Sequence, residues 1–99
     1  MNVFKLYRYD TNEVIYEAKA LCIGACLEQA VLDNVQLDYV DLSNCRLNDI
    51  NLDDAKIRHG NFRGSVLTGA NMSEGDFQGC DFSNALMHGA CLNESKLTH

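Results

Sequence analysis

Large apolar side chains recur at every fifth position over the C-terminal two-thirds of this chain. They are Leu37, Leu42, Leu47, Leu52, Ile57, Phe62, Leu67, Met72, Phe77, Phe82, Met87, Leu92 and Leu97. The residues two places earlier are mostly small: Val35, Val40, Cys45, Ile50, Ala55, Gly60, Ser65, Ala70, Gly75, Cys80, Ala85, Ala90 and Ser95. A period of five matches neither an α-helix nor a simple strand, and it predicts a closed coil with one pentapeptide per side. Each side turns one large and one small residue inward, and coils stack at about 4.8 Å, the spacing of β-strands.

Two stretches carry a recognisable motif. The segments SVLTGANMSEGDF and DFSNALMHGACL resemble the consensus A(D/N)Lxx of pentapeptide-repeat proteins, and the resemblance covers about two-thirds of the chain. It implies an all-β solenoid, a right-handed quadrilateral β-helix with four pentapeptides per coil. We therefore expect one compact domain with the solenoid over residues 35–99 and an N-terminal cap over 1–34, because the end of a solenoid exposes an open core.

The first part of the cap has the pattern of a β-hairpin. Residues 3–8 and 14–17 read as two strands, and Asp10, Thr11 and Asn12 supply the turn between them. A hairpin of this kind resembles the caps of several small family members.

The second part of the cap allows two interpretations. Residues 21–32 favour a short amphipathic helix. Leu27 and Leu32 also lie in phase with the five-residue repeat, which would start the solenoid earlier. The helix is preferred because the solenoid phase would turn Cys26 and Val31 outward.

Composition narrows the class of protein. The chain has 99 residues, no apolar run of membrane-spanning length, and no signal-peptide core in MNVFKLYRYD, which favours the cytoplasm. Five cysteines are an odd number, so reduced thiols are expected, and Cys45 and Cys80 at small inward positions act as compact hydrophobes.

The charges suggest a partner. The net charge is −6, which disfavours direct contact with nucleic acid and suits a basic protein. Residues twenty apart share a column, so an acidic face should hold Asp49, Asp53, Asp54, Glu74 and Glu94, and a second one Asp41 and Asp81. Like charges stacked about 4.8 Å apart cost stability. The acidic face could be retained despite this cost because a partner binds it. An acidic face that only keeps the protein in solution is an equally good explanation.

No catalytic, cofactor or metal site is expected. The three histidines do not cluster, no zinc ligand set is visible, and outward carboxylates lie on flat faces. The repeat runs almost to the last residue, so Leu92 and Leu97 are expected to form an exposed end that a second copy covers. That end resembles the dimerisation end of longer, DNA-mimicking family members.

Two functions follow. The resemblance to family members that protect DNA gyrase from quinolones, together with the acidic charge, implies a DNA mimic. Such a protein would occupy the basic groove of a topoisomerase or a phage-defence complex. The alternative is a structural or scaffold protein that binds through the cap or through the exposed pair Val66 and Leu86.

Overall fold

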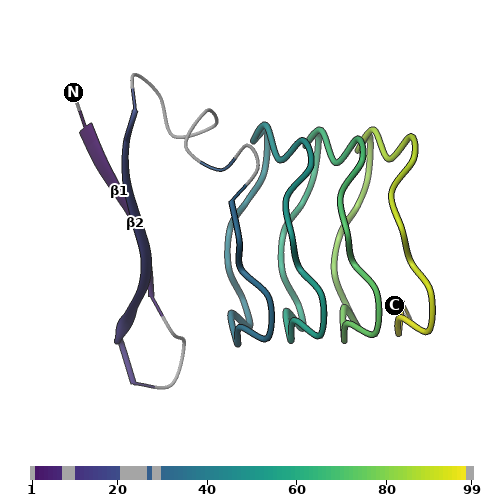
Figure 1. Ribbon diagram of the computed structural model, residues 1–99, viewed down its shortest axis with the longest axis horizontal. Coiled ribbons are helices and arrows are strands. Elements are labelled where there is room, and N and C mark those ends of the chain that lie inside the picture. Colours follow the sequence, from purple (N-terminus) through teal and green to yellow (C-terminus); the bar gives the residue numbers. More distant parts are fainter. Residues whose placement is uncertain (1, 8–10, 21–26, 28–29, 98–99) are drawn as a thin grey trace.

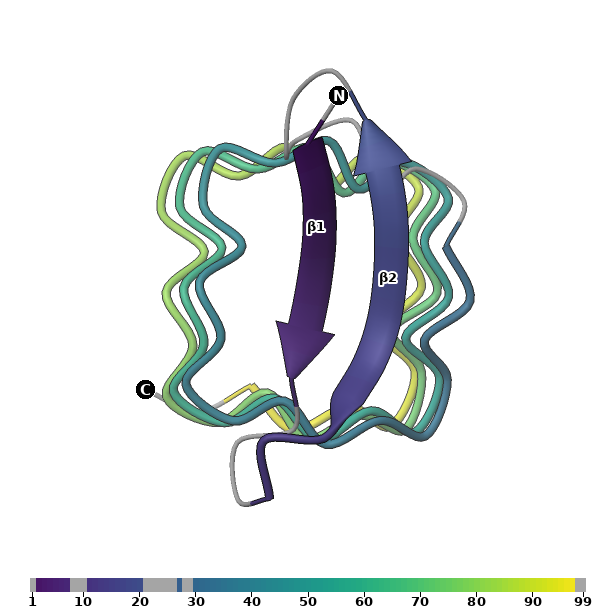
Figure 2. The same cartoon turned by 90° about the vertical axis from the view of Figure 1, so that its left-hand side faces the viewer.

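The computed structural model describes residues 2–7, 11–20, 27 and 30–97. They form a stack of four-sided coils with a β-hairpin at its N-terminal end (Figure 1). Seen along the stack, the outlines of successive coils nearly superimpose, and the hairpin lies across the square outline of the first coil (Figure 2).

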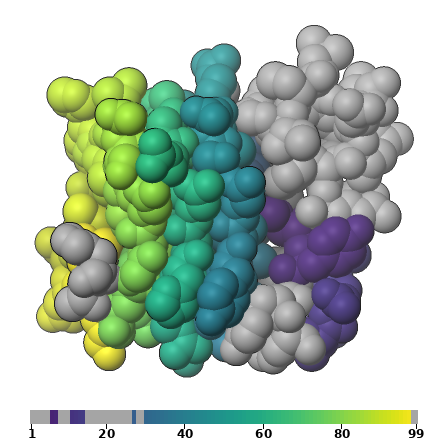
Figure 3. All heavy atoms as spheres, turned by 180° about the vertical axis from the view of Figure 1, so that it is seen from behind, coloured from purple at the N-terminus to yellow at the C-terminus, as the bar shows by residue number. Residues whose placement is uncertain are grey.

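Successive coils are joined by parallel β-bridges between residues twenty apart. One column runs Val31, Asn51, Asn71 and Cys91. The N–H of Asn51 donates to the carbonyl of Ala30 at 2.9 Å in the coil before it. The N–H of Leu52 donates to the carbonyl of Asn71 at 2.7 Å in the coil after it. The predicted stacking is confirmed, and Figure 3 shows the coils as adjoining bands of side chains.

Each side ends in a turn that needs one left-handed residue. Every fifth residue from Asn34 to Glu94 has a φ between 55° and 75°. The turn at Leu37 closes with an N–H from Val40 to its carbonyl at 3.1 Å. A positive φ at the third residue is the mark of a type II turn, which explains why Asn, Asp and Gly occupy most of these positions.

The Asp or Asn that precedes the large inward residue stabilises the backbone of the same turn. Asn71 Oδ1 accepts the N–H of Ser73 at 3.1 Å, and Asn61 Oδ1 accepts the N–H of Arg63 at 3.0 Å. This side-chain cap accounts for the D/N of the repeat motif in terms of folding alone.

The large inward side chains form a continuous core. Those from Leu37 to Met72 have no exposed surface. Phe62 stacks on Phe82 with ring centroids 4.9 Å apart and meets Phe77 edge-on at 6.4 Å. Burial declines toward the C-terminal end, where Leu97 is 39% exposed, because no later described coil covers that end.

The predicted pairing of two N-terminal strands is confirmed, whereas residues 8–10 of the predicted hairpin lie outside the described residues. Strands β1 (Asn2–Tyr7) and β2 (Val14–Ala20) pair antiparallel, with a bulge between Leu6 and Tyr7. Leu6 is buried in the same cluster as the inward residues of the coils, so the hairpin packs on the first coil.

The predicted helix over 21–32 is wrong at its C-terminal end. Residues 30–32 lie in a coil: Val31 bridges to Asn51, and the N–H of Leu32 donates to the carbonyl of Asn51 at 2.8 Å. The five-residue phase turns Val31 outward, and this side chain is 67% exposed. The same phase buries Leu27, Ala30 and Leu32 and pairs their backbone, which outweighs the exposure of Val31. The coils therefore begin ahead of the predicted start at residue 35. Residues 21–26 and 28–29 lie outside the described residues, so the residue at which the cap gives way to the solenoid stays a matter of prediction.

Candidate functional site

Three acidic residues lie one above another on one corner of the solenoid. Asp54, Glu74 and Glu94 each occupy the left-handed position of a turn, with φ of 60°, 57° and 59°. Adjacent coils hold these turns in register, since the N–H of Asp54 donates to the carbonyl of Ser73 at 2.9 Å. The N–H of Glu74 donates likewise to the carbonyl of Asn93 at 2.8 Å. All three side chains are exposed, and we call this column the acidic ladder.

The electrostatics of the acidic ladder are those of crowded like charges. The negative charges of Asp54, Glu94 and Asp53, in that order, raise the pKa of Glu74, as does a hydrogen bond with Glu94. A shallow hollow beside the ladder is lined by Asp53, Ser73, Glu74, Asn93 and Glu94. Among the described residues, the charged side chains that line this hollow are all acidic.

Asp49 lies apart from the acidic ladder. It occupies the left-handed position of the preceding turn, in a column with Gly69 and Gly89. Its carboxylate lies over Gly69, where an added Cβ would collide with Asp49 Oδ1. The structure therefore places Asp49 on another corner, outside the hollow that Asp53, Glu74 and Glu94 share.

Asp41 and Asp81 have a local structural role. Each accepts hydrogen bonds from the backbone N–H and the hydroxyl of the serine two residues on, Ser43 and Ser83, at 2.6 to 3.0 Å. These bonds lower the pKa of both carboxyls. Asp81 also pairs with Arg63 at 3.4 Å. The two carboxylates share a column with Asn61, which makes the same backbone bond.

The three cysteines among the described residues divide between the core and the acidic corner. Cys80 is buried, and burial raises its pKa to about 11, which makes it unreactive. Cys91 is half-buried beside the acidic hollow, with Sγ 3.0 Å from Ser73 Oγ. That hydrogen bond lowers the pKa of Cys91, and the sequence pattern did not point to this contact.

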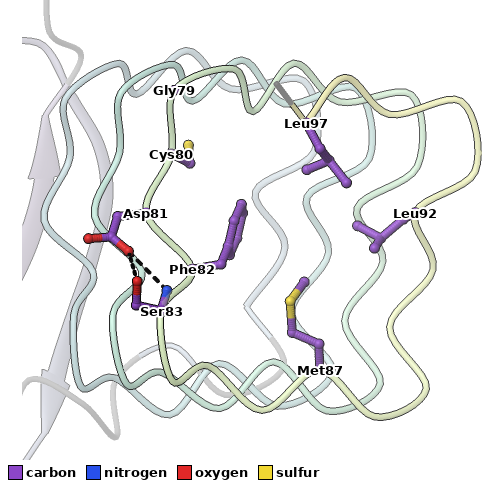
Figure 4. A pocket seen from close by; sticks show the side chains of 8 residues that line it. All are labelled: Gly79, Cys80, Asp81, Phe82, Ser83, Met87, Leu92 and Leu97. Carbon is purple, nitrogen blue, oxygen red and sulfur yellow. Dashed lines mark hydrogen bonds between the residues drawn. The ribbon is translucent and has the colours of Figure 1, made fainter. Parts of the chain in front are cut away.

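Leu92 and Leu97 line an open apolar hollow at the C-terminal end. Phe82 and Met87 complete its apolar lining, and Figure 4 shows these side chains directed into the square of the last coil. The predicted exposed end is thus present in the described residues, and nothing in the structure shows what covers it.

Within the described residues, no group of three or more His, Cys, Asp or Glu is arranged to hold a metal ion. In that same part of the chain, no helix has the length and apolar character needed to cross a membrane.

The repeated sequence matches the model of a known protein family. A model described as pentapeptide repeats, in eight copies, matches residues 18–54, 45–84 and 61–98. The chain belongs to the pentapeptide-repeat family. Its fold is therefore the right-handed quadrilateral β-helix that the motif implied.

Two solved pentapeptide-repeat structures are similar to this chain. The protein HetL of the cyanobacterium Nostoc sp. strain PCC 7120, described as involved in heterocyst differentiation regulation, shares 25% identity with a TM-score of 0.50. It aligns over 75% of this chain and 46% of its own length. The protein Rfr23 of the cyanobacterium Cyanothece 51142 shares 20% identity with a TM-score of 0.48, over 70% of this chain and 54% of its own.

The pentapeptide-repeat chain thus spans about half the length of either neighbour. A comparison with curated protein sequences finds no match. The family match establishes the fold, and the partner is to be inferred from the surface.

Proposed function

We propose that this pentapeptide-repeat protein is a non-enzymatic acidic binding protein that imitates nucleic acid. The observation that supports this function is the acidic ladder of Asp54, Glu74 and Glu94 with Asp53 beside it. Stacked coils repeat these carboxylates about every 4.8 Å. Phosphates along one strand of DNA repeat about every 3.4 Å along the helix axis, so the two charge densities are of similar size.

The mechanism is competition for a basic groove. The carboxylates of the ladder occupy the cationic channel that a topoisomerase or a phage-defence complex uses for phosphates. The net charge of −6 steers the protein toward that channel and accelerates association. The five cysteines and their expected reduced state favour action in the cytoplasm.

The cost of the ladder supports a role for it beyond solvation. Its three residues repel one another, and Glu74 and Glu94 are not the residue types that left-handed backbone favours. Asp41 and Asp81 need no such explanation, because their bonds to Ser43 and Ser83 stabilise the turns.

The test compares two charge-matched double variants. Glu74→Gln with Glu94→Gln and Asp41→Asn with Asp81→Asn each change the net charge from −6 to −4, since two negative charges are removed from the same total. Asn is compatible with the turns at 41 and 81, because Asn61 already makes that backbone bond. The variants are titrated into a type II topoisomerase supercoiling assay and a phage-defence DNA-binding assay at 50 to 300 mM KCl.

Mimicry predicts that inhibition by the unaltered protein weakens steeply with salt. The ladder variant should then lose affinity by about tenfold or more, while the Asp41 and Asp81 variant loses much less. Equal losses in the two variants, or no salt-dependent inhibition in either assay, would exclude the acidic ladder as the binding surface.

A second candidate function is a scaffold role through an apolar strip. Leu86 is 53% exposed and bridges to the half-buried Val66, which bridges in turn to Arg46. Binding through this strip, or through the cap, would depend little on salt. A Leu86→Asn variant that lost partner binding, while the ladder variant kept it, would favour this function.

We also propose that two copies associate through their C-terminal ends. The apolar hollow lined by Phe82, Met87, Leu92 and Leu97 supports this arrangement. In the preceding coil, the N–H groups of Phe62, Leu67 and Met72 donate to carbonyls of the coil that follows. The equivalent N–H groups of the last coil, those of Phe82, Met87 and Leu92, meet no later described coil and so offer an unpaired edge. Sedimentation at high protein concentration tests it, and a monomer under all conditions excludes it.

A further inference from the structure

The left-handed turn positions reveal a second unusual corner of the solenoid. Most of them hold Asn, Asp or Gly, the residues that accept this backbone most readily. Tyr39 and His59 depart from this rule, with φ of 66° and 58°. A bulky residue at positive φ is an outlier that often accompanies function.

The two side chains form one built feature. Their rings stack with centroids 5.3 Å apart and planes inclined by 16°. In the next coil the same column holds Gly79, where an added Cβ would lie 2.5 Å from His59 Nδ1. Glycine therefore leaves room for the imidazole, and the pair stands at the corner with Tyr39 69% exposed.

An ion pair whose charges balance flanks the Tyr39–His59 stack in the sequence. Arg58 donates through Nε at 3.2 Å and Nη2 at 3.0 Å to Asp38 Oδ2, and Asp38 is only 6% exposed. The guanidinium is therefore balanced by a buried carboxylate. The Arg58–Asp38 ion pair therefore presents no uncompensated positive charge to a cation that approaches the exposed ring of Tyr39.

We propose that the Tyr39–His59 pair is a contact for an arginine side chain of the basic partner. This proposal rests on the proposed function, because the net charge of −6 is what brings a basic protein to this surface. Arginine is the cation that most often stacks on aromatic rings, and tyrosine is enriched among residues that dominate binding energy. The acidic ladder supplies long-range attraction, and Tyr39 supplies a short-range contact that prefers a planar cation.

The probes are two nine-residue peptides, oligo-arginine and oligo-lysine, titrated at several salt concentrations. Tyr39→Asn should fold at least as well as the unaltered protein, because Asn suits the left-handed position, as at Asn34 and Asn44. It should bind oligo-arginine about 2- to 5-fold more weakly at every salt concentration. Its affinity for oligo-lysine should change less, since an ammonium group stacks less well than a guanidinium.

Matched variants make the result decisive. Asn84→Gly changes the same backbone position on another corner and should leave both affinities unaltered. Tyr39→Gly provides a second ring deletion with compatible backbone, should Tyr39→Asn melt at a lower temperature. Unchanged oligo-arginine binding in either folded ring deletion overturns the inference, and so does an equal loss for both peptides.

Failure of this inference is distinguishable from failure of the proposed function. Loss of the Tyr39 contact shifts affinity by the same factor at all salt concentrations. Loss of the acidic ladder in the Glu74 and Glu94 double variant reduces the salt dependence itself.

Discussion

Replacing Ser65 by alanine should destabilise the solenoid more than its size suggests. Ser65 has no exposed surface and sits at a small inward position. Its hydroxyl donates to the carbonyl of Leu42, and its Oγ accepts the N–H of Cys45 at 3.3 Å. The hydroxyl is thereby inserted into the turn between Leu42 and Cys45, one coil earlier.

The same insertion recurs twice. Cys80 Sγ donates to the carbonyl of Ile57, and Ser95 Oγ donates to the carbonyl of Met72 at 2.5 Å. In all three cases the side chain lies 23 residues after the carbonyl it contacts. A small polar group at these positions therefore links a turn to the coil that follows it.

The expected loss of stability in Ser65→Ala follows from leaving buried polar groups without a partner. Ser65→Ala removes one donor and one acceptor from a buried turn, which costs about 1–3 kcal/mol. For a domain of this size, each kcal/mol lowers the melting temperature by about 4–8 °C. A fall of roughly 4–24 °C is therefore expected in thermal unfolding followed by circular dichroism, with urea unfolding as an independent measure.

Three variants separate the hydrogen bonds from the packing. Ser65→Cys should lower the melting temperature much less than Ser65→Ala, because the thiol of Cys80 makes the equivalent bond to the carbonyl of Ile57. Ser95→Ala should lower the melting temperature less than Ser65→Ala does, because Ser95 is only half-buried and water can reach the carbonyl that it contacts. Ala70→Ser should bring no gain, since the carbonyl of Leu47 already accepts the N–H of Ile50 at 3.2 Å. A Ser65→Ala protein within about 0.5 kcal/mol of the unaltered chain would refute the reasoning.

Three further outcomes are expected. Gly75→Ala should destabilise by about 1–3 kcal/mol in thermal melts, because an added Cβ would lie 2.7 Å from Cζ of the buried Phe77 ring; unchanged stability would contradict that packing. The folded state lowers the pKa of Asp81, so this carboxyl stabilises the protein above its ordinary pKa of 3.8, and that stability is lost as the pH falls through the folded pKa. The folded state raises the pKa of Glu74, so this carboxyl has the opposite effect, and the free energy of unfolding should rise as the pH falls toward 4.5. Acid titrations of Asp81→Asn and Glu74→Gln should each remove the corresponding slope. Leu97→Asp should shift any dimer seen in sedimentation to the monomer without lowering the melting temperature, since Leu97 is 39% exposed in the single chain.

The sequence by itself determined the coil, because the information for it is local. A large residue every fifth position, a small one two places earlier and a turn residue after it repeat within each pentapeptide. The turn at Leu37 and the cap of Asn71 on Ser73 need no distant partner. The twenty-residue register then placed Asp54, Glu74 and Glu94 in one column, so that part of the candidate site was predictable.

Tertiary structure decided what depends on neighbours in other coils. Residues 30–32 carry both a helical and a five-residue pattern, and burial of Leu32 with backbone pairing to Asn51 selects the coil. Asp49 joined the acidic face in the pattern but lies on another corner. The Tyr39–His59 stack arises between residues twenty apart, and its fit depends on a glycine one coil further on. Such contacts have no signature within a pentapeptide, because their energy comes from side chains that only the stacking of coils brings together.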